Sequence, residues 1–469
     1  MTARHPLEPD AAGMRDLASD IVERAIAFIE ALPDRPAGGS GPPAEDLLAT
    51  LRTPPPERPG DRAALLDLLE RATDHAYETA GPGYFAYIPG GGLFAAAAAE
   101  LYTRATNRYV GLAGPAPALV AVEDSVVRWL GDVCGLPDGR GGILTTGGSM
   151  ANLSAVVAAR HDRLGEEFAA GTLYLTEHTH QSVAKAARIA GFPARAIRTV
   201  PCGPDLRMDV DAAAALIAAD RRAGHRPFLL VASAGTTNTG AVDPLAALAD
   251  LAEREGLWYH VDGAYGGLFR LTGRGRQRLA GTERADSITL DPHKTLFLSY
   301  GTGALAVRDP ARLAAAHESS GHYLQDLGPG GDLPDYAHLS PELSRDVRGV
   351  RLWLPLHLYG VDAFRVALDE KLDLAGSAYR ALAEEPALEV PWEPELSVVA
   401  FRMAGADSDR RSRALLAAVN ASGRVFLSST DIDGRFTLRL CVVVHRTHAD
   451  RVAEAVDIVV AAARRLSHS

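Results

Sequence analysis

Asp291–Lys294 combines an acid, a proline, a histidine and a lysine between two largely apolar runs. Residues 287–290 have the pattern of a buried strand, and residues 295–298 are again mostly apolar. Apolar surroundings lower the pKa of a lysine, and the free amine is then a nucleophile that can form a Schiff base with a carbonyl compound. A lysine at a strand end with its amine in solvent is the alternative, and this stretch alone favours neither.

Asp262 ends a second apolar strand, residues 258–261, and is followed by the small residues Gly263 and Ala264. A buried carboxylate at a strand end needs a cation or a hydrogen-bond donor. The protonated ring nitrogen of pyridoxal phosphate is such a partner, and the acid keeps that ring an electron sink. An aspartate that caps the following helix is the alternative.

Residues 143–152 run from an apolar strand through Gly147, Gly148 and Ser149 into an alanine-rich helix. Glycines let the backbone approach an anion, and the N–H groups of the helix start can bind a phosphate. The stretch lacks the lysine of a Walker loop and the third glycine of a dinucleotide fingerprint. A strand–turn–helix without a ligand remains the alternative.

Two more polar turns follow apolar strands. His180 could stack on a flat pyridine ring, whereas His178 is typical of a solvated turn residue. No third ligand follows these histidines at zinc spacing, so we expect no metal site. Thr237 lies in a loop of small residues that could place a hydroxyl at the edge of a cofactor.

In order and spacing as well as in residue type, these motifs resemble the group II pyridoxal-phosphate-dependent amino acid decarboxylases, which include aromatic-L-amino-acid decarboxylase. The resemblance covers residues 82–447. It implies an α/β protein of fold type I of the pyridoxal-phosphate-dependent transferases, similar to aspartate aminotransferase. It also implies pyridoxal 5'-phosphate as cofactor and conversion of an L-amino acid, aromatic or related, to the amine and carbon dioxide.

The resemblance assigns roles residue by residue. Lys294 would form the Schiff base, and Asp262 would pair with the pyridine nitrogen between His180 on one ring face and Ala264 on the other. The remaining cofactor contacts would come from Gly148, Ser149 and His293 at the phosphate, Thr237 near the ring oxygen, and Asp291, which stands where many members have asparagine.

Tyr323 matches a tyrosine on the family's mobile loop that protonates the carbanion left by carbon dioxide. Relatives that convert amino acids oxidatively to aldehydes have phenylalanine there, so Tyr323 favours simple decarboxylation. A loop tyrosine that packs on the surface is the alternative. An aminotransferase or oxidative deaminase of the same fold in natural-product metabolism is the second functional hypothesis, and a cofactor-free scaffold is the third.

Tyr87, Ile88, Pro89 and Gly90 lie in a stretch that resembles the family's substrate segment. Ile88 replaces an aromatic residue there and provides shape without ring stacking. Many members also have tryptophan after the lysine, where this chain has Thr295. These departures concern the substrate, which could have a smaller or aliphatic side chain, more than the chemistry.

Strands that alternate with helices position these residues. We expect strands at residues 142–145, 172–175, 195–200, 227–232, 257–261, 287–290 and 304–307. This order predicts a mostly parallel seven-stranded sheet with helices on both faces. Ligands of such sheets bind beyond the carboxyl ends of strands, where most of the chemically interesting residues fall.

We expect three parts: an N-terminal helical arm (1–83), a large cofactor-binding domain (84–365) and a small α+β C-terminal domain (366–469). The small domain should have strands at 396–402, 424–428 and 436–444 and a helix at 447–465. In the family the arm wraps the other subunit of a homodimer whose active site lies at the interface; a free tail is the alternative. Four arginines could anchor a carboxylate or a loop, although surface ion pairs are the more frequent role: Arg345, Arg348, Arg439 and Arg446.

The composition of the chain limits the kinds of partner that we expect it to bind. The 469 residues carry a formal net charge of −11, which argues against binding nucleic acid because phosphate backbones need a basic surface. The three cysteines are scattered and form no disulfide framework, which is typical of a reducing cytoplasm. No apolar run is long enough for a bilayer and the first residues lack the apolar core of a signal peptide, so we expect a cytoplasmic protein with no membrane partner.

Overall fold

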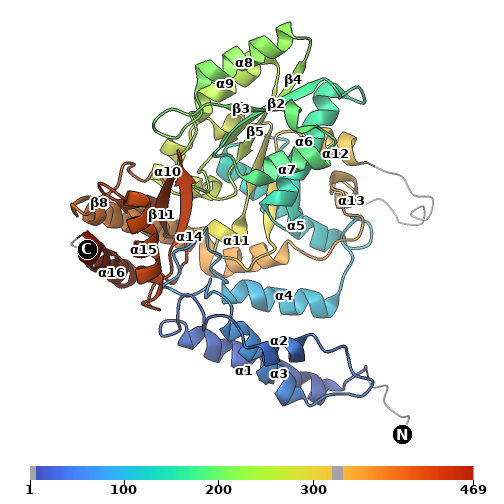
Figure 1. Cartoon of the computed structure of the whole chain (residues 1–469). Helices are drawn as coiled ribbons and strands as arrows, with labels where there is room; N and C mark the ends of the chain where they lie inside the picture. Colours follow the sequence, from blue (N-terminus) through green and yellow to red (C-terminus); the bar gives the residue numbers. More distant parts are fainter. Residues whose placement is uncertain (1–6, 319–330, 468–469) are drawn as a thin grey trace.

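A seven-stranded sheet lies at the centre of the computed structural model, which describes residues 7–318 and 331–467 (Figure 1). Its strand order is β1-β7-β6-β5-β4-β2-β3. β7 is antiparallel to both of its neighbours and all other pairs are parallel, so the predicted mostly parallel sheet is confirmed. The strands are β1 (Gly141–Thr145), β2 (Gly171–Thr176), β3 (Ile197–Val200), β4 (Arg226–Ser233), β5 (Trp258–Asp262), β6 (Ser287–Leu290) and β7 (Gly303–Val307).

Helices cover both faces of this sheet, as expected. Alternate strand residues point to opposite faces, so Leu230 and Ile288 belong to one hydrophobic core and Leu229 and Val231 to the other. The first core is completed mainly by α5 (Pro117–Cys134), α8 (Val210–Arg222) and α9 (Leu245–Glu255). The second is completed by α6 (Gly148–Leu164), α7 (Gln181–Ile189) and α12 (Pro310–His317).

A four-stranded antiparallel sheet of order β10-β11-β9-β8 forms the C-terminal part. Its elements are β8 (Leu388–Glu389), β9 (Val398–Met403), β10 (Ser428–Ile432), β11 (Arg435–Cys441), α15 (Ser408–Asn420) and α16 (Ala449–Ser467). The strand predicted at 424–428 is wrong, because β10 begins only at Ser428. Phe426 instead pairs with the start of the predicted large domain, where Phe85 N donates to Phe426 O at 2.9 Å.

α14 (Val350–Ala383) connects the two sheets and bends at Gly360, whose φ of 75° suits a residue without a side chain. Its residues as far as Leu372 pack in the core of the large sheet, and from Leu374 onward they pack in the core of the small one. The helix therefore runs across the predicted domain boundary at residue 365, which stays a prediction.

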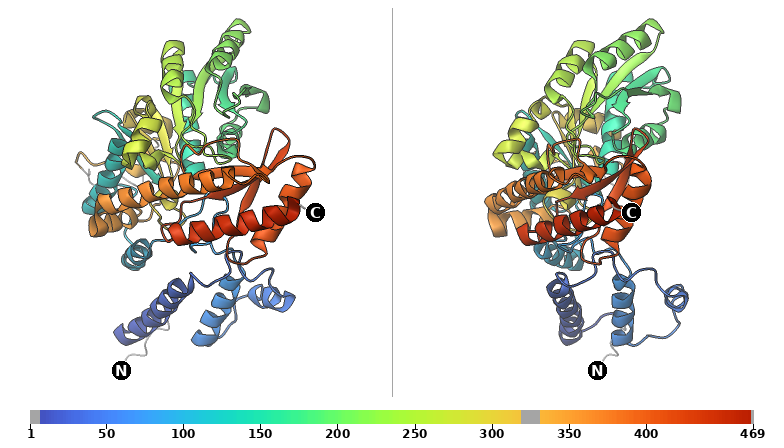
Figure 2. Two further views of the ribbon diagram at one scale, coloured as in Figure 1. Left: turned by 90° about the vertical axis from the view of Figure 1, so that its left-hand side faces the viewer. Right: turned by 60° about the vertical axis from the view of Figure 1, so that its left-hand side comes forward.

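The N-terminal helices project away from this body, as Figure 2 shows from two sides. They are α1 (Ala11–Ala31), α2 (Glu45–Leu51) and α3 (Arg62–Asp74). Neither α1 nor α3 has a buried residue, although both carry apolar side chains. Ile21 is 48% exposed, Leu65 53% and Leu69 58%.

The remaining helices are α4 (Phe94–Thr106), α10 (Gly273–Arg278), α11 (Pro292–Thr295) and α13 (Tyr336–Leu339). Within residues 7–318 and 331–467, no helix is both long enough and apolar enough to cross a membrane.

Candidate active site

The turn after β6 places Lys294 beside an acid. Asp291 ends the strand and Pro292 begins α11, where a residue without an N–H costs no hydrogen bond. Within this turn, Lys294 Nζ lies 2.8 Å from Asp291 Oδ2. Asp291 is only 2% exposed. The apolar flanks predict apolar surroundings for the amine, but its immediate neighbour is a carboxylate three residues earlier in the same turn.

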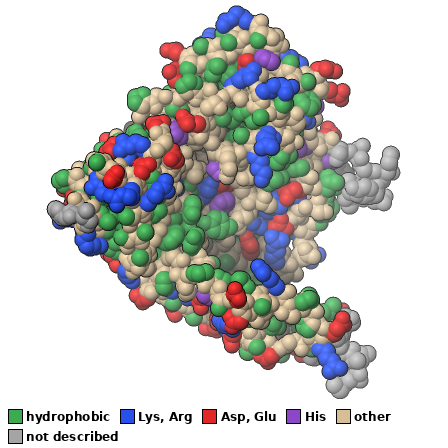
Figure 3. Space-filling view, viewed as in Figure 1, with side chains coloured by type: hydrophobic (Ala, Val, Ile, Leu, Met, Phe, Trp, Pro, Cys, Tyr) green, Lys and Arg blue, Asp and Glu red, His purple; other side chains and the backbone are tan. Residues whose placement is uncertain are grey.

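A cavity of about 250 Å³ opens at this turn. Eight predicted residues line it: Gly148, Ser149, His180, Asp262, Ala264, Asp291, His293 and Lys294. Gly147 of the predicted glycine turn also lines it, together with four residues that the sequence did not single out for a role: Thr146, Met150, Asn152 and Ser182. Histidine, basic and acidic side chains gather near the middle of the face seen in Figure 3.

The β1–α6 turn forms one wall of the cavity. Gly147 has φ 149° and ψ 172°, a conformation that residues with a Cβ rarely adopt. A Cβ on Gly303 would lie 2.5 Å from Gly147 Cα, so β7 and this turn pack without room for side chains. The first N–H groups of α6 have no partner within their own helix, and the positive end of the helix dipole favours an anion there.

His293 lies at the same end of the cavity. Its Nδ1 lies 2.8 Å from the carbonyl oxygen of Thr302, so Nδ1 carries the hydrogen and donates it. Burial lowers the pKa of His293, against the attraction of Asp291. Among the described residues, Asp291 Oδ1 is buried and has no hydrogen-bond partner. Such an unsatisfied atom fits a site that a ligand completes.

Asp262 and His180 are held from behind by Asn152 and Ser182. Asp262 Oδ1 accepts a hydrogen bond from Ala264 N at 3.1 Å, and Oδ2 accepts one from Asn152 Nδ2 at 3.0 Å. Ser182 N donates to His180 Nδ1 at 3.3 Å. Helix spacing could have pointed to Asn152, because it lies four residues after Gly148 on the same face of α6.

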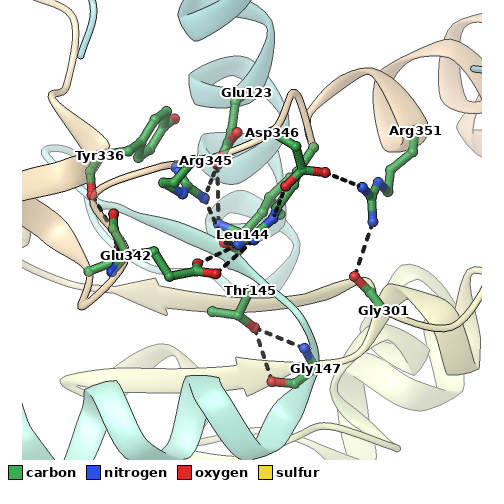
Figure 4. A network of polar contacts seen from close by, with 12 residues as sticks. Glu123, Leu144, Thr145, Gly147, Gly301, Tyr336, Glu342, Arg345, Asp346 and Arg351 are labelled. Atoms are coloured by element: carbon green, nitrogen blue, oxygen red, sulfur yellow. Dashed lines mark hydrogen bonds and ion pairs between the residues drawn. The ribbon is translucent and has the colours of Figure 1, made fainter. Parts of the chain in front are cut away.

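Buried arginines hold the chain that follows the undescribed residues 319–330 (Figure 4). Arg345 Nη2 donates to Glu123 Oε1 at 2.8 Å and to Leu144 O at 2.7 Å, and the Arg345 and Glu123 side chains are at most 1% exposed. Arg351 donates to Gly301 O, in the turn before β7. The surface ion pair expected for Arg345 is therefore wrong, since both partners lie in the core beside β1.

Arg348 forms ion pairs with the partly exposed Glu342 and Asp346, whereas Arg439 and Arg446 anchor loops, a role that the sequence had left open. Arg348 Nη1 donates to Leu144 O at 3.2 Å, and its side chain is 7% exposed. Arg446 Nη1 donates to Gly91 O at 2.6 Å. Arg439, on β11, donates to the carbonyl oxygens of Tyr87, Thr237 and Asn238. The small sheet thereby fixes two loops of the large domain.

Several predicted residues lie outside the cavity lining. Thr237 and the predicted substrate segment, Tyr87, Ile88, Pro89 and Gly90, are not part of it. This segment nevertheless runs against the Lys294 turn, because a Cβ on Gly90 would lie 2.9 Å from His293 O. Their roles in binding stay predictions. Tyr323 lies outside the described residues, so its predicted role is likewise untested.

The lining fits pyridoxal 5'-phosphate group by group. Lys294 supplies an amine for the aldehyde, Asp262 an acceptor for the ring N–H, and the start of α6 a cradle for the phosphate. His180 and Ala264 supply a ring and a methyl group for the two faces. The carboxylate beside the amine and the glycine turn are features that a merely structural strand end does not need.

Comparisons with known proteins agree with this fit. The family model "Pyridoxal-dependent decarboxylase conserved domain" matches residues 45–404. Aromatic-L-amino-acid decarboxylase of Bacillus atrophaeus is 31% identical over 99% of this chain and 98% of its own length. L-2,4-diaminobutyrate decarboxylase of Rhizobium meliloti (strain 1021) is also 31% identical, over 87% of this chain and 83% of its own.

Solved structures give the same result. The crystal structure of Oryza sativa TDC with PLP and tryptamine superimposes with a TM-score of 0.93 at 28% identity, covering 99% of both chains. The predicted fold type and the predicted cofactor, pyridoxal phosphate, are thereby confirmed. The chain belongs to the pyridoxal-dependent decarboxylase family and is a pyridoxal-phosphate-dependent carboxy-lyase.

Proposed function

We propose that this protein converts an aromatic L-amino acid to the corresponding amine and carbon dioxide. The observation that carries the proposal is the single cavity that Lys294, Asp262, His180 and the β1–α6 turn line together. The aromatic substrate class is supported by the Bacillus relative and by the structure of Oryza sativa TDC with PLP and tryptamine. The diaminobutyrate relative makes an aliphatic substrate the competing choice.

Each residue of the lining has a task in this proposal. Lys294 binds the aldehyde carbon of the cofactor, Asp262 holds its ring nitrogen, and Gly148, Ser149 and His293 hold its phosphate. The bound cofactor supplies the electron sink for the electron pair that remains when carbon dioxide leaves. His180 and Ala264 confine the ring plane, because orientation of the scissile bond decides which bond breaks.

Asp291 is proposed to orient the lysine. Its Oδ2 lies 2.8 Å from Lys294 Nζ and can accept a hydrogen bond from it, which fixes the position of the amine in the cavity wall. The buried Oδ1 of the same carboxylate has no partner among the described residues and is available to a group of the ligand.

The reaction outcome is proposed to depend on Tyr323, which would protonate the substrate carbon after decarboxylation. Replacing it by phenylalanine should divert product from amine toward aldehyde, ammonia and hydrogen peroxide, with dissolved oxygen as the two-electron oxidant and water as the source of the aldehyde oxygen. Unchanged amine output from Tyr323→Phe would remove this role. An aminotransferase or oxidative deaminase is the alternative function, and a keto acid or aldehyde as the main product of the unmodified enzyme would select it.

The central experiment is a product assay with purified, cofactor-loaded protein and a panel of natural amino acids that includes 2,4-diaminobutyrate. We expect equimolar amine and carbon dioxide from an aromatic substrate. Borohydride reduction should then give a phosphopyridoxyl peptide that contains Lys294. Failure to find that peptide would remove the proposed role of Lys294, and a protein without absorption from bound cofactor would support a scaffold instead.

We also propose that the protein is a cytoplasmic homodimer whose active sites lie at the subunit interface. The apolar side chains exposed on the arm support this, since a free arm would leave them in water. α4 adds to this surface with Leu101, 57% exposed, and Tyr102, 67% exposed. Sedimentation analysis tests the dimer, and a monomer at working concentration would contradict it.

A further inference from the structure

Asn152 is the centre of a hydrogen-bond network directly behind the cavity. Its Nδ2 donates to Asp262 Oδ2 at 3.0 Å and to Ser182 Oγ at 2.9 Å. Its Oδ1 accepts from Thr289 Oγ1 at 2.6 Å and lies 3.0 Å from His260 Nε2. All five residues are buried. The amide therefore joins the cavity wall to the interior of the sheet.

The network continues away from the cavity along two neighbouring strands. His260 Nδ1 lies 2.8 Å from Ser287 Oγ, and Trp258 Nε1 donates to that same oxygen at 2.8 Å. His260 is the register partner of Ser287, and Asp262 that of Thr289. Residues 258, 260 and 262 alternate along β5 and so share the sheet face that α6 covers.

The carboxylate end of this chain of hydrogen bonds fixes its direction. An indole N–H can only donate and an ionised carboxylate can only accept. Because Asp262 accepts from Nδ2, the amide oxygen of Asn152 must face His260. His260 Nε2 must therefore carry a hydrogen, because two hydrogen-bond acceptors would otherwise face each other.

The other ring nitrogen of His260 then follows. Burial lowers the pKa of His260 to about 4, against the attraction of Asp262, so the ring is neutral near pH 7 and has one N–H. With that hydrogen on Nε2, Nδ1 is an acceptor and takes the hydroxyl hydrogen of Ser287. Ser287 Oγ in turn accepts from Trp258, so every hydrogen in the chain has one consistent place.

We infer that Asn152, backed by His260, Ser287 and Trp258, positions the Asp262 carboxylate. Asn152 Nδ2 is the side-chain donor to Asp262 Oδ2, so the amide fixes the rotation of the carboxylate. The four residues are positioning residues, because they act on the cofactor through Asp262. This inference rests on the proposed placement of Asp262 at the ring nitrogen.

The same amide also orients the stacking histidine. Asn152 Nδ2 donates to Ser182 Oγ, whose hydroxyl lies 2.7 Å from His180 Nδ1. The backbone N–H of Ser182 donates to that nitrogen too, so Nδ1 is an acceptor and neutral His180 carries its hydrogen on Nε2. One buried amide thus sets the carboxylate at the ring nitrogen and the imidazole proposed for the ring face.

The first test needs no variant. Long-range ¹H–¹⁵N NMR of the cofactor-free protein, with ¹⁵N-labelled histidine, reads which nitrogen of His260 carries hydrogen, and His260→Gln assigns the signal. We expect a neutral ring with hydrogen on Nε2 at pH 7. Hydrogen on Nδ1, or a charged ring, would overturn the inference, because the chain would then run the other way.

The second test measures the cofactor. Ring-¹⁵N-labelled pyridoxal phosphate bound to Asn152→Leu should give a nitrogen signal shifted toward the unprotonated position, with kcat lowered about tenfold and KM nearly unchanged. His260→Leu should lower kcat by about threefold, because Thr289 still supports the amide, whereas His260→Gln, which keeps a donor near the Nε2 position, should stay within about twofold. If the glutamine and leucine variants of His260 lowered kcat equally, the proposed chain of hydrogen bonds would be contradicted.

Tyr174→Phe is the matched control. Tyr174 is a buried residue of the same sheet, and its hydroxyl donates to Asp220 Oδ2 at 2.6 Å, outside the network. Its variant should lose stability without moving the nitrogen signal. Asp262→Asn separates the two proposals. If this variant leaves the ¹⁵N signal of the cofactor unchanged, the placement of Asp262 at the ring nitrogen is wrong. If it moves that signal but Asn152→Leu does not, only the role of Asn152 is wrong.

Discussion

The side chains behind the cavity at the carboxyl ends of the large sheet and those on the N-terminal arm differ in the partners that they have within this chain. Behind the cavity, polar groups such as Asn152 and His260 are buried, and each has partners in the same chain. On α1 and α3, apolar groups such as Ile21 and Leu69 remain 48% and 58% exposed. A buried polar group is costly without a partner, and so is an exposed apolar surface. The buried polar groups therefore have partners within this chain, whereas the apolar groups of the arm are only partly covered by it.

Lys294→Ala gives the largest expected effect on this comparison. It removes the proposed nucleophile and the partner of Asp291, so kcat/KM for amine formation should fall by roughly a thousandfold or more. Lys185→Ala removes an exposed lysine on α7 and serves as the control. Similar activities of the two variants would show that the sheet end is not the reaction centre.

Glu123→Ala tests how strongly the sheet end depends on its internal partners. The variant leaves the Arg345 guanidinium buried without its carboxylate, which costs about 3–5 kcal/mol of unfolding free energy. Glu253→Ala removes a 79% exposed carboxylate from an ion pair with Arg284 and should cost less than about 1 kcal/mol. Chemical denaturation of both variants measures the difference. Equal losses would mean that burial does not decide the strength of these pairs here.

Leu65→Asp with Leu69→Asp tests the arm. The two leucines lie four residues apart on one face of α3, and charges there should weaken the proposed dimer by about 30-fold or more. Sedimentation equilibrium gives the dissociation constant, and Arg71→Asp, on another face of the helix, is the control. If the double variant stays as dimeric as the control, the exposed face is not the interface.

The smallest effect concerns pH. The pKa of His260 is lowered by burial to about 4 in the folded chain, below its ordinary value of about 6.5. The unfolded chain therefore binds a proton that the folded chain does not, so stability is lost as the pH falls from about 6.5 to 4. At pH 5.5 the loss from this residue is about 1.4 kcal/mol.

His260→Gln should remove that part of the pH dependence. Unfolding midpoints at pH 7 and pH 5.5 measure it, and His225→Gln at an exposed position should leave the dependence unchanged. An identical fall in stability for both variants would contradict a neutral, buried His260.

Most of the large domain could be predicted from the sequence. Most of the seven strands are short apolar runs that end at small or polar residues, so β5 and β6 were expected within one or two residues of their bounds. The small domain was harder, because residues 424–427 pair with the segment near Tyr84 rather than with their neighbour in the chain. A contact between segments about 340 residues apart leaves no periodic signal in either.

The residues of the candidate active site could likewise be predicted only in part. Lys294, Asp262 and Gly148 were predicted because each follows a strand, and carboxyl ends of parallel strands meet at one edge. Asn152, Ser182 and the chain behind them were not, because an asparagine in a helix has no pattern that tells which strand it will face. The buried roles of Arg345 and Arg439 were missed for a similar reason: their partners are backbone oxygens of distant turns.

The sequence by itself determined the element order, the residues offered at the strand ends and the family chemistry they support. These properties are local, because residue type and spacing along a strand or a helix carry them. Only the tertiary structure decided that one amide holds both Asp262 and His180. Such contacts depend on how α6 lies across β5 and β6, and helix-on-sheet packing is fixed by the shape of the whole core.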